Sequence, residues 1–218
     1  MNTKTKPDNK KLFKNFFYDF VLFTGALPGF IWLHPRYLYK SPEAKKHIKG
    51  GALVVSNHIS LFDPVYLLFT IWYRRHRFVC IQELCSHPLA RWFFTKARCI
   101  PIDRENMNLG SMREIIDALK NEEIVTLFPE GHINESKEPL DTFKSGVVLM
   151  SIMSGKPIVP VYIHKKPGFG GLTVVIGEVL DPMLLYGRRP TSAEIGEISE
   201  LLRQRAHELM TICEEAQL

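Results

Sequence analysis

From residue 50 onward, short apolar runs alternate with segments of helical character, and this alternation constrains the fold more than any other feature. The runs that indicate strands are short and rich in β-branched side chains. They are Ala52–Ser56, Arg77–Ile81, Cys99–Ile102, Ile124–Phe128, Ile158–Ile163 and Leu172–Ile176. The predicted helices are Pro64–Tyr73, Pro88–Lys96, Leu109–Lys120, Asp141–Ser154 and Ser192–Glu215. Such alternation predicts the α/β class, with a mostly parallel sheet flanked by helices on both faces.

The first 49 residues differ from the rest in charge and hydropathy. They hold ten Lys and Arg against three Asp and Glu, in a chain of net charge +5. Within them Phe16–Leu33 is apolar, but Asp19, Pro28 and two glycines interrupt it, and a spanning helix needs about 20 clean residues. We expect a helical hairpin or an in-plane helix on a membrane surface; the alternative is packing on the protein body. The chain therefore divides into a membrane-associating helical segment, 1–49, and an α/β domain, 50–218.

Several other classes of function find little support. The four cysteines form no C-x-x-C pair and the eight histidines no H-x-x-x-H pair, so we expect reduced cysteines in a cytosolic protein and no metal site. The glycine patterns of nucleotide-binding loops are absent. The basic N-terminus raises the alternative of nucleic-acid binding, but the apolar Phe16–Leu33 beside the lysines favours a lipid surface.

Two polar motifs directly follow predicted strands: NHISLFD at 57–63 and FPEG at 128–131. Open α/β sheets form their sites beyond the carboxyl ends of the strands. If the two strands are parallel, both motifs face the same edge. A histidine placed five residues before an aspartate, as His58 and Asp63 are, can act as a general base whose tautomer the carboxylate fixes.

Two other readings of the first motif stay open. Asp63 precedes a proline, and this pair is typical of a helix start, so Asp63 can serve as an N-cap, with or without a bond to His58. Ser60 is a possible nucleophile, although no G-x-S-x-G pattern surrounds it.

Four blocks in this order resemble the 1-acylglycerol-3-phosphate acyltransferase family, the glycerolipid acyltransferases. They are NHISLFD at 57–63, CIPIDR at 99–104, FPEG at 128–131 and IVPVYI at 158–163. The segment Phe143-Lys144-Ser145-Gly146 also looks like the family's F-K-x-G segment. The resemblance covers residues 15–185, and the four blocks together are far more specific than any one of them.

The resemblance implies a glycerol-phosphate acyltransferase-like fold and O-acyl transfer without a cofactor. His58 would be the general base and Asp63 its orienter. The co-substrate would be an acyl thioester of coenzyme A or acyl carrier protein. The acceptor would be a lysophospholipid, first of all 1-acyl-sn-glycerol-3-phosphate, giving phosphatidic acid. The enzyme would lie on a membrane, peripheral or monotopic, with its catalytic domain in the cytoplasm.

The resemblance also implies a set of substrate-binding residues. Arg104, with Lys96, would bind the acceptor phosphate through charge-assisted hydrogen bonds. Glu130 and Gly131 would shape the acceptor pocket, and Asn57 would complete the set.

One departure concerns the acceptor. The family's third block usually continues F-P-E-G-T-R, whereas this chain has His132 and Ile133 after the glycine. An isoleucine cannot pair with phosphate, and losing such a contact costs about 1.5–3 kcal/mol. Two alternatives follow: an acyltransferase for a different lysolipid head group, and a catalytically weak lipid-binding membrane protein.

Overall fold

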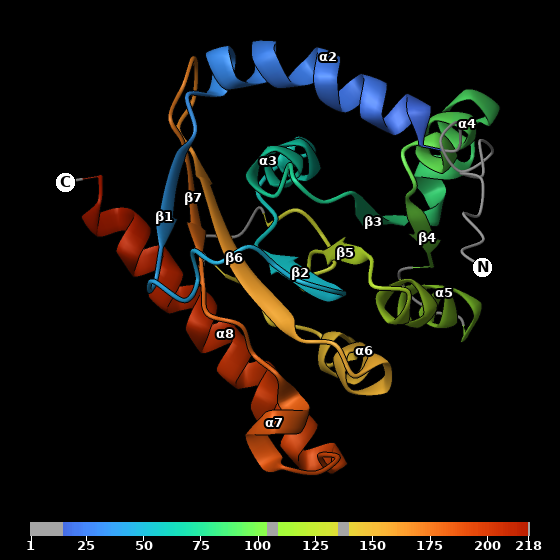
Figure 1. The fold of residues 1–218 in the computed structure, drawn as a ribbon, viewed down its shortest axis with the longest axis vertical. Helices are drawn as coiled ribbons and strands as arrows, with labels where there is room; N and C mark the ends of the chain where they lie inside the picture. The colour runs from blue at the N-terminus through green and yellow to red at the C-terminus, as the bar shows by residue number, and fades with distance from the viewer. Residues whose placement is uncertain (1–14, 104–108, 135–139, 218) are drawn as a thin grey trace, which may run out of the picture.

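The computed structural model describes residues 15–103, 109–134 and 140–217, and these residues form one seven-stranded sheet (Figure 1). The strands are β1 (Arg36–Tyr39), β2 (Ala52–Ser56), β3 (His76–Ile81), β4 (Ile100–Ile102), β5 (Ile124–Leu127), β6 (Ile158–Lys165) and β7 (Leu172–Ile176). Their order is β1-β7-β6-β2-β5-β3-β4, and neighbours are parallel except for the antiparallel pair β6–β7. The predicted α/β class with a mostly parallel sheet is confirmed.

Strand β2 lies at the centre of the sheet because every one of its side chains can be buried. Its five residues are all buried, as expected for a strand covered on both faces. Val54 lies level with Thr126 of β5 on one side and with Val159 of β6 on the other. Since β2 and β5 are parallel neighbours, the two polar motifs that follow them meet at the same edge of the sheet.

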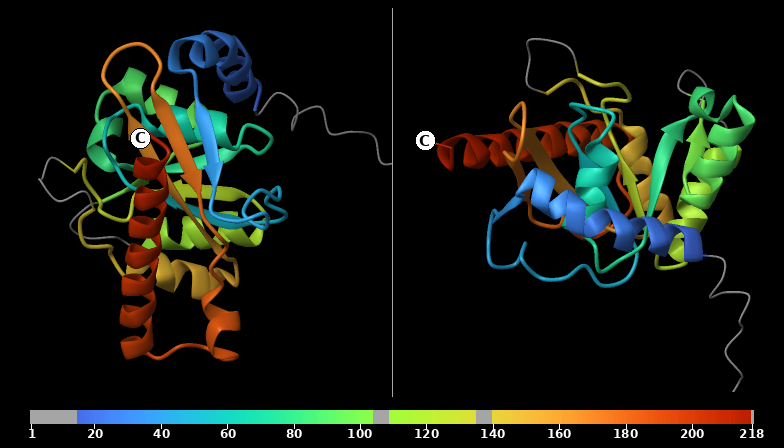
Figure 2. Two further views of the ribbon diagram at one scale, coloured as in Figure 1. Left: turned by 90° about the vertical axis from the view of Figure 1, so that its left-hand side faces the viewer. Right: turned by 90° about the horizontal axis from the view of Figure 1, so that it is seen from above.

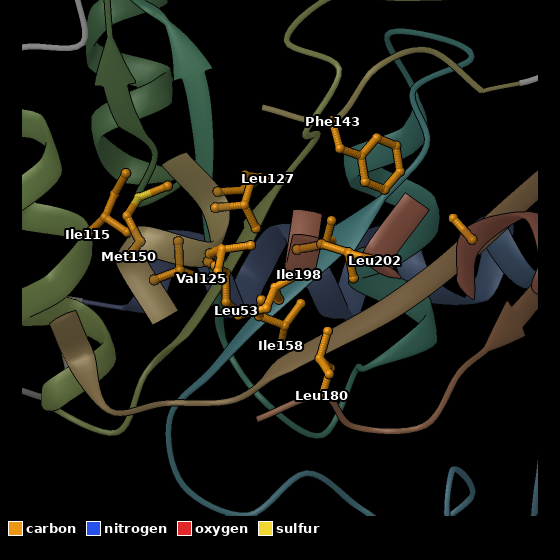
Figure 3. Close-up of a cluster of buried hydrophobic side chains, with 14 of the residues drawn as sticks. Leu53, Ile115, Val125, Leu127, Phe143, Met150, Ile158, Leu180, Ile198 and Leu202 are labelled. Atoms are coloured by element: carbon orange, nitrogen blue, oxygen red, sulfur yellow. The ribbon is translucent and has the colours of Figure 1, made fainter. Parts of the chain in front are cut away.

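Helices cover both faces of the sheet (Figure 1). They are α2 (Phe16–Leu33), α3 (Asp63–Thr70), α4 (Pro88–Lys96), α5 (Leu109–Lys120), α6 (Gly146–Ser154), α7 (Pro182–Tyr186) and α8 (Ser192–Glu215), with a short 3₁₀ helix, η1 (Gln82–Cys85). Helices α5, α6 and α8 pack on one face, and α3 with α2 on the other. Figure 3 shows the first layer, where Leu53 and Val125 of the sheet lie with Met150 of α6 and Leu202 of α8.

Helix α6 begins at Gly146, so the prediction of a helix from Asp141 is wrong over its first five residues. The Lys144 N–H donates to the Pro129 carbonyl at 3.1 Å, and the Asp141 N–H donates to the Glu130 carboxylate at 3.2 Å. These tertiary bonds hold residues 141–144 against the FPEG segment and replace the helical bonds that the sequence predicted.

The N-terminal segment forms one helix, α2, and not a hairpin. The charge of Asp19 is compensated because its carboxylate accepts two hydrogen bonds from the Arg75 guanidinium, each 2.8 Å long. Beyond α2, Arg36–Tyr39 pairs with β7 as an edge strand, although the sequence placed it in the helical segment 1–49. Among the described residues, no helix combines the length and the apolar character that crossing a membrane requires.

Candidate active site

The carboxylate of Asp63 organises the loop that follows β2. Asp63 is buried and is the first residue of α3. Its Oδ2 lies 2.7 Å from His58 Nδ1 and accepts the N–H groups of Ile59 (2.7 Å) and Ser60 (2.9 Å). Its Oδ1 accepts the Ser60 hydroxyl at 2.9 Å. These four bonds fix the carboxylate and the loop that carries the histidine.

The two other readings of this loop do not fit the contacts. The N-cap of α3 is Phe62, so Asp63 starts the helix but its carboxylate bonds the preceding loop and does not cap the helix. The Ser60 hydroxyl donates to Asp63 and accepts the Phe62 N–H at 3.2 Å. A nucleophilic serine would normally donate to a histidine, whereas here the Ser60 hydroxyl and the His58 ring both bond to Asp63.

His58 has a fixed ring and one free ring nitrogen. Because Asp63 accepts the proton on Nδ1, Nε2 keeps the lone pair that can take a proton. The ring stacks on Phe128, with centroids 4.0 Å apart and 12° between the planes. The His58 side chain is 16% exposed and lines a cavity, so it is held firmly and is still accessible.

The Glu130 carboxylate hydrogen-bonds to two backbone segments of the site, at His58 and at Asp141. Its Oε1 accepts the His58 N–H and its Oε2 the Asp141 N–H, each at 3.2 Å, while the Asn134 N–H donates to the His58 carbonyl at 2.8 Å. Burial raises the pKa of the Glu130 carboxyl, and these hydrogen bonds act in the opposite direction. Glu130 is buried and is not among the described residues that line the cavity. The structure therefore shows Glu130 positioning the backbone around the site, and its expected part in shaping the acceptor pocket stays a prediction.

Gly131 lines the cavity in a conformation that favours glycine. Its φ is +76°, and a Cβ built there would lie 3.1 Å from the Nζ of Lys144. The glycine thus lets the Lys144 side chain lie directly over the FPEG backbone. No role is predicted for Lys144 from the sequence, although its place in the F-K-x-G segment is a signal that could have identified it.

The cavity beside His58 has a volume of about 840 Å³. Aromatic and aliphatic side chains from α2, α3, β3, α4, α5 and α6 supply most of its wall; examples are Phe17, Leu68, Phe78, Phe94, Ile115 and Met150. Ligand sites are typically apolar cavities with a few polar groups that fix the orientation of the ligand. The cavity has this character, and His58 is one of its few polar groups.

The structure does not bring every predicted binding residue to the cavity. Asn57 is buried, and its side-chain amide exchanges two hydrogen bonds with the Ile163 backbone, of 2.9 and 2.8 Å. It therefore joins the end of β2 to β6 and is not among the described residues that line the cavity. Lys96 lies in a separate surface hollow with Arg91, away from the described lining of the cavity. Arg104 lies outside the described residues.

Comparisons with known proteins agree with one another. Residues 36–164 match the family described as Acyltransferase. The chain is 28% identical over 167 residues to a 1-acyl-sn-glycerol-3-phosphate acyltransferase of Bacillus subtilis, covering 73% of this chain and 81% of that protein. A 1-acyl-sn-glycerol-3-phosphate acyltransferase of Streptococcus pneumoniae is 24% identical, with 71% of this chain and 57% of the relative covered.

The fold also has a relative of known structure. The crystal structure of the 1-acyl-sn-glycerophosphate (LPA) acyltransferase PlsC from Thermotoga maritima superposes with a TM-score of 0.65. The match covers 93% of this chain and 91% of the other at 21% identity. At this identity the similarity establishes a common fold.

Proposed function

Since the chain belongs to the acyltransferase family, we propose that it acylates the free hydroxyl of a lysophospholipid, with 1-acyl-sn-glycerol-3-phosphate as the acceptor. The donor in this proposal is an acyl thioester of coenzyme A or acyl carrier protein, and the product is phosphatidic acid. The observation that supports it most is the His58–Asp63 pair, held at the wall of a large apolar cavity. The names of the relatives point to the same acceptor.

The reaction follows from the geometry of the pair. Nε2 of His58 takes the proton of the acceptor hydroxyl while the hydroxyl oxygen forms a bond to the thioester carbonyl carbon. Asp63 stabilises the imidazolium through its contact with Nδ1. When the tetrahedral intermediate collapses, the carbon–sulfur bond breaks and the imidazolium returns the proton to the leaving thiolate. A positioned base of this kind contributes about 10²–10⁴ in rate.

Direct transfer in a ternary complex explains the contacts better than a covalent acyl-enzyme. The Ser60 hydroxyl is committed to Asp63. Cys80 and Cys99 line the cavity, but the neighbouring Cys99 thiol and burial raise the pKa of the Cys80 thiol. A thiol that keeps its proton is a poor nucleophile.

Helix α2 supports a membrane-facing orientation of the site. One side of it, at Phe17 and Val21, lines the cavity. Apolar side chains elsewhere on it are exposed; they are Phe16, Phe20, Phe23, Ile31 and Trp32. Figures 1 and 2 place α2 on the outer surface at the end of the molecule opposite α7. In the proposed arrangement α2 lies on the cytoplasmic surface of a bilayer, as a peripheral or monotopic anchor, and lipid substrates enter beside it.

The membrane orientation can be tested with the full chain and sedimented anionic vesicles. Phe23→Ser with Trp32→Ser should lower the vesicle partition coefficient about tenfold or more, since each removes a large apolar side chain from the contact. The matched control is Leu184→Ser with Leu185→Ser on α7, where two exposed apolar side chains are also lost, at the far end. Equal losses in both proteins would contradict the orientation.

The activity is tested by acyl transfer from labelled acyl-CoA, and from acyl carrier protein, to a panel of lysophospholipids in mixed micelles. Product from 1-acyl-sn-glycerol-3-phosphate should form with the wild type and disappear in His58→Ala. His47→Ala, on the exposed surface, should retain activity. Product from another lysolipid alone would show that the acceptor carries a different head group. No product from any acceptor with either donor would favour the lipid-binding alternative.

A further inference from the structure

Building on the proposed function, we infer that the Lys144 ammonium binds the phosphate of the acceptor and makes the site selective for an anionic head group. The chain lacks the arginine expected two residues after Gly131 and has Ile133 there. The structure places another cation at the same wall.

The charges in the cavity point to this lysine. Among the described residues that line it, Lys144 is the one lysine or arginine. Most of the rest of that lining is apolar, and its histidine and carboxylate side chains are His58, His132 and Asp103. None of these is a lysine or arginine, and a phosphate inside the cavity would need a charged partner to offset its lost hydration. The described carboxylates do not pair with the Lys144 ammonium, which leaves it available to an anionic ligand.

His132 is poorly placed for the same task. Its Nδ1 lies 3.0 Å from the Glu130 carbonyl oxygen, and its Nε2 lies 3.1 Å from the Asp141 carboxylate. Both ring nitrogens are therefore engaged by protein oxygens. The carboxylate offsets any charge on the ring and would repel a phosphate close to it.

Two contacts with the FPEG segment define the position of Lys144, one at its backbone and one at its ammonium. Its N–H donates to the Pro129 carbonyl at 3.1 Å. Its Nζ lies so close to Gly131 that a Cβ there would come within 3.1 Å of it. The same FPEG segment also contacts His58, through the Phe128 ring. Base and cation are thus anchored to one loop, so a single acceptor molecule can present its hydroxyl to one and its phosphate to the other.

The kinetic test compares two acceptors of equal chain length, 1-acyl-sn-glycerol-3-phosphate and a monoacylglycerol without phosphate. Lys144→Met should raise the KM for the phosphate-bearing acceptor about 10- to 100-fold, the loss expected for one charge-assisted contact. The kcat and the KM for monoacylglycerol should change little, and Lys144→Arg should restore most of the affinity. Lys120→Met, a matched loss of charge on the exposed end of α5, should behave as the wild type.

Coenzyme A also carries phosphates, so the KM of the donor is measured in the same proteins. A rise in the acyl-CoA KM with an unchanged acceptor KM would assign Lys144 to the donor and overturn the inference. Unchanged KM values for both substrates would overturn it as well.

A binding measurement separates this inference from the proposed reaction. In a His58→Ala background, calorimetric titration with the two amphiphiles should show the phosphate preference, and adding Lys144→Met should abolish it. If the wild type transfers no acyl group but this preference is present, the inference stands and the proposed reaction fails. If the preference is absent while transfer proceeds, the inference alone fails.

Discussion

The rings of His58 and Phe128 lie face to face, with centroids 4.0 Å apart and planes inclined by 12°. One residue follows β2 and the other follows β5, so the stack joins the two motifs across the sheet edge. Asp63 holds the same imidazole at its edge through Nδ1. Together these two contacts define both the plane and the rotation of the ring.

Removing the stacked ring should impair the rate more than binding. In Phe128→Ala the imidazole loses one of its two constraints, and small displacements of a reacting group cost up to about 10²-fold. We expect a 10- to 100-fold lower kcat with an almost unchanged acceptor KM, measured by steady-state acyl transfer. Phe128→Tyr keeps the ring and should retain most of the rate. A large KM effect with normal kcat would show that Phe128 contacts the substrate instead.

Asp63→Asn should be nearly inactive although the protein folds. The amide is a weaker acceptor than the carboxylate and cannot stabilise an imidazolium, so kcat should fall by about 10²–10⁴. The four bonds of the carboxylate also predict a lower free energy of unfolding, by about 1–3 kcal/mol. Chemical denaturation and initial rates measure both effects. Asp117→Asn on the exposed side of α5 is the control and should change neither.

Glu130 should make stability depend on pH. Because burial raises its pKa in the folded protein, the folded state binds more protons than the unfolded chain at pH values above the ordinary glutamate pKa of about 4.3. The free energy of unfolding therefore falls as pH rises through the window between the ordinary and the raised pKa.

A glutamine at this position cannot titrate. The free energy of unfolding of Glu130→Gln minus that of the wild type should therefore increase as the pH rises from about 4 to about 7. Thermal or urea unfolding at several pH values measures this difference. Glu215→Gln, at an exposed position in α8, provides the comparison. A difference that stays constant with pH would rule out the raised pKa.

Alanine at two glycines should have opposite effects on stability. Gly131→Ala forces a Cβ into a left-handed conformation and towards Lys144, which should cost about 1–2 kcal/mol and raise the acceptor KM. Gly196 lies inside α8 with open space around it, so Gly196→Ala should gain about 0.5–1 kcal/mol. Equal changes in both variants would mean that the Gly131 conformation carries no strain for alanine.

The sequence predicted the elements whose pattern is local. Strand β2 was predicted with its observed bounds because five consecutive small or apolar residues are buried on both faces. Strand β1 was missed, since Arg36–Tyr39 has exposed ends and a charged residue and pairs only at the sheet edge. The start of α6 was wrong because bonds to Pro129 and Glu130, far away in sequence, override the local helical preference.

The same division applies to the site. The contact between His58 and Asp63 spans five residues and could be predicted from the motif. The positioning role of Glu130, the burial of Asn57 and the placement of Lys144 depend on contacts with residues distant in the chain. Spacing within a sequence carries no information about such contacts.

In the proposed reaction, the loop after β5 holds one pair of residues that positions the base and another pair that lies near the head group. Phe128 and Glu130 hold His58 in position. The Phe128 ring stacks on the imidazole, and the buried Glu130 carboxylate accepts the His58 N–H. Ile133 and Lys144 line the cavity. With Lys144 on the head group as inferred, a change at the second pair would alter which lipid is accepted and leave the His58–Asp63 pair intact. New head-group preferences would then be accessible by one-residue steps, without passing through an inactive intermediate sequence.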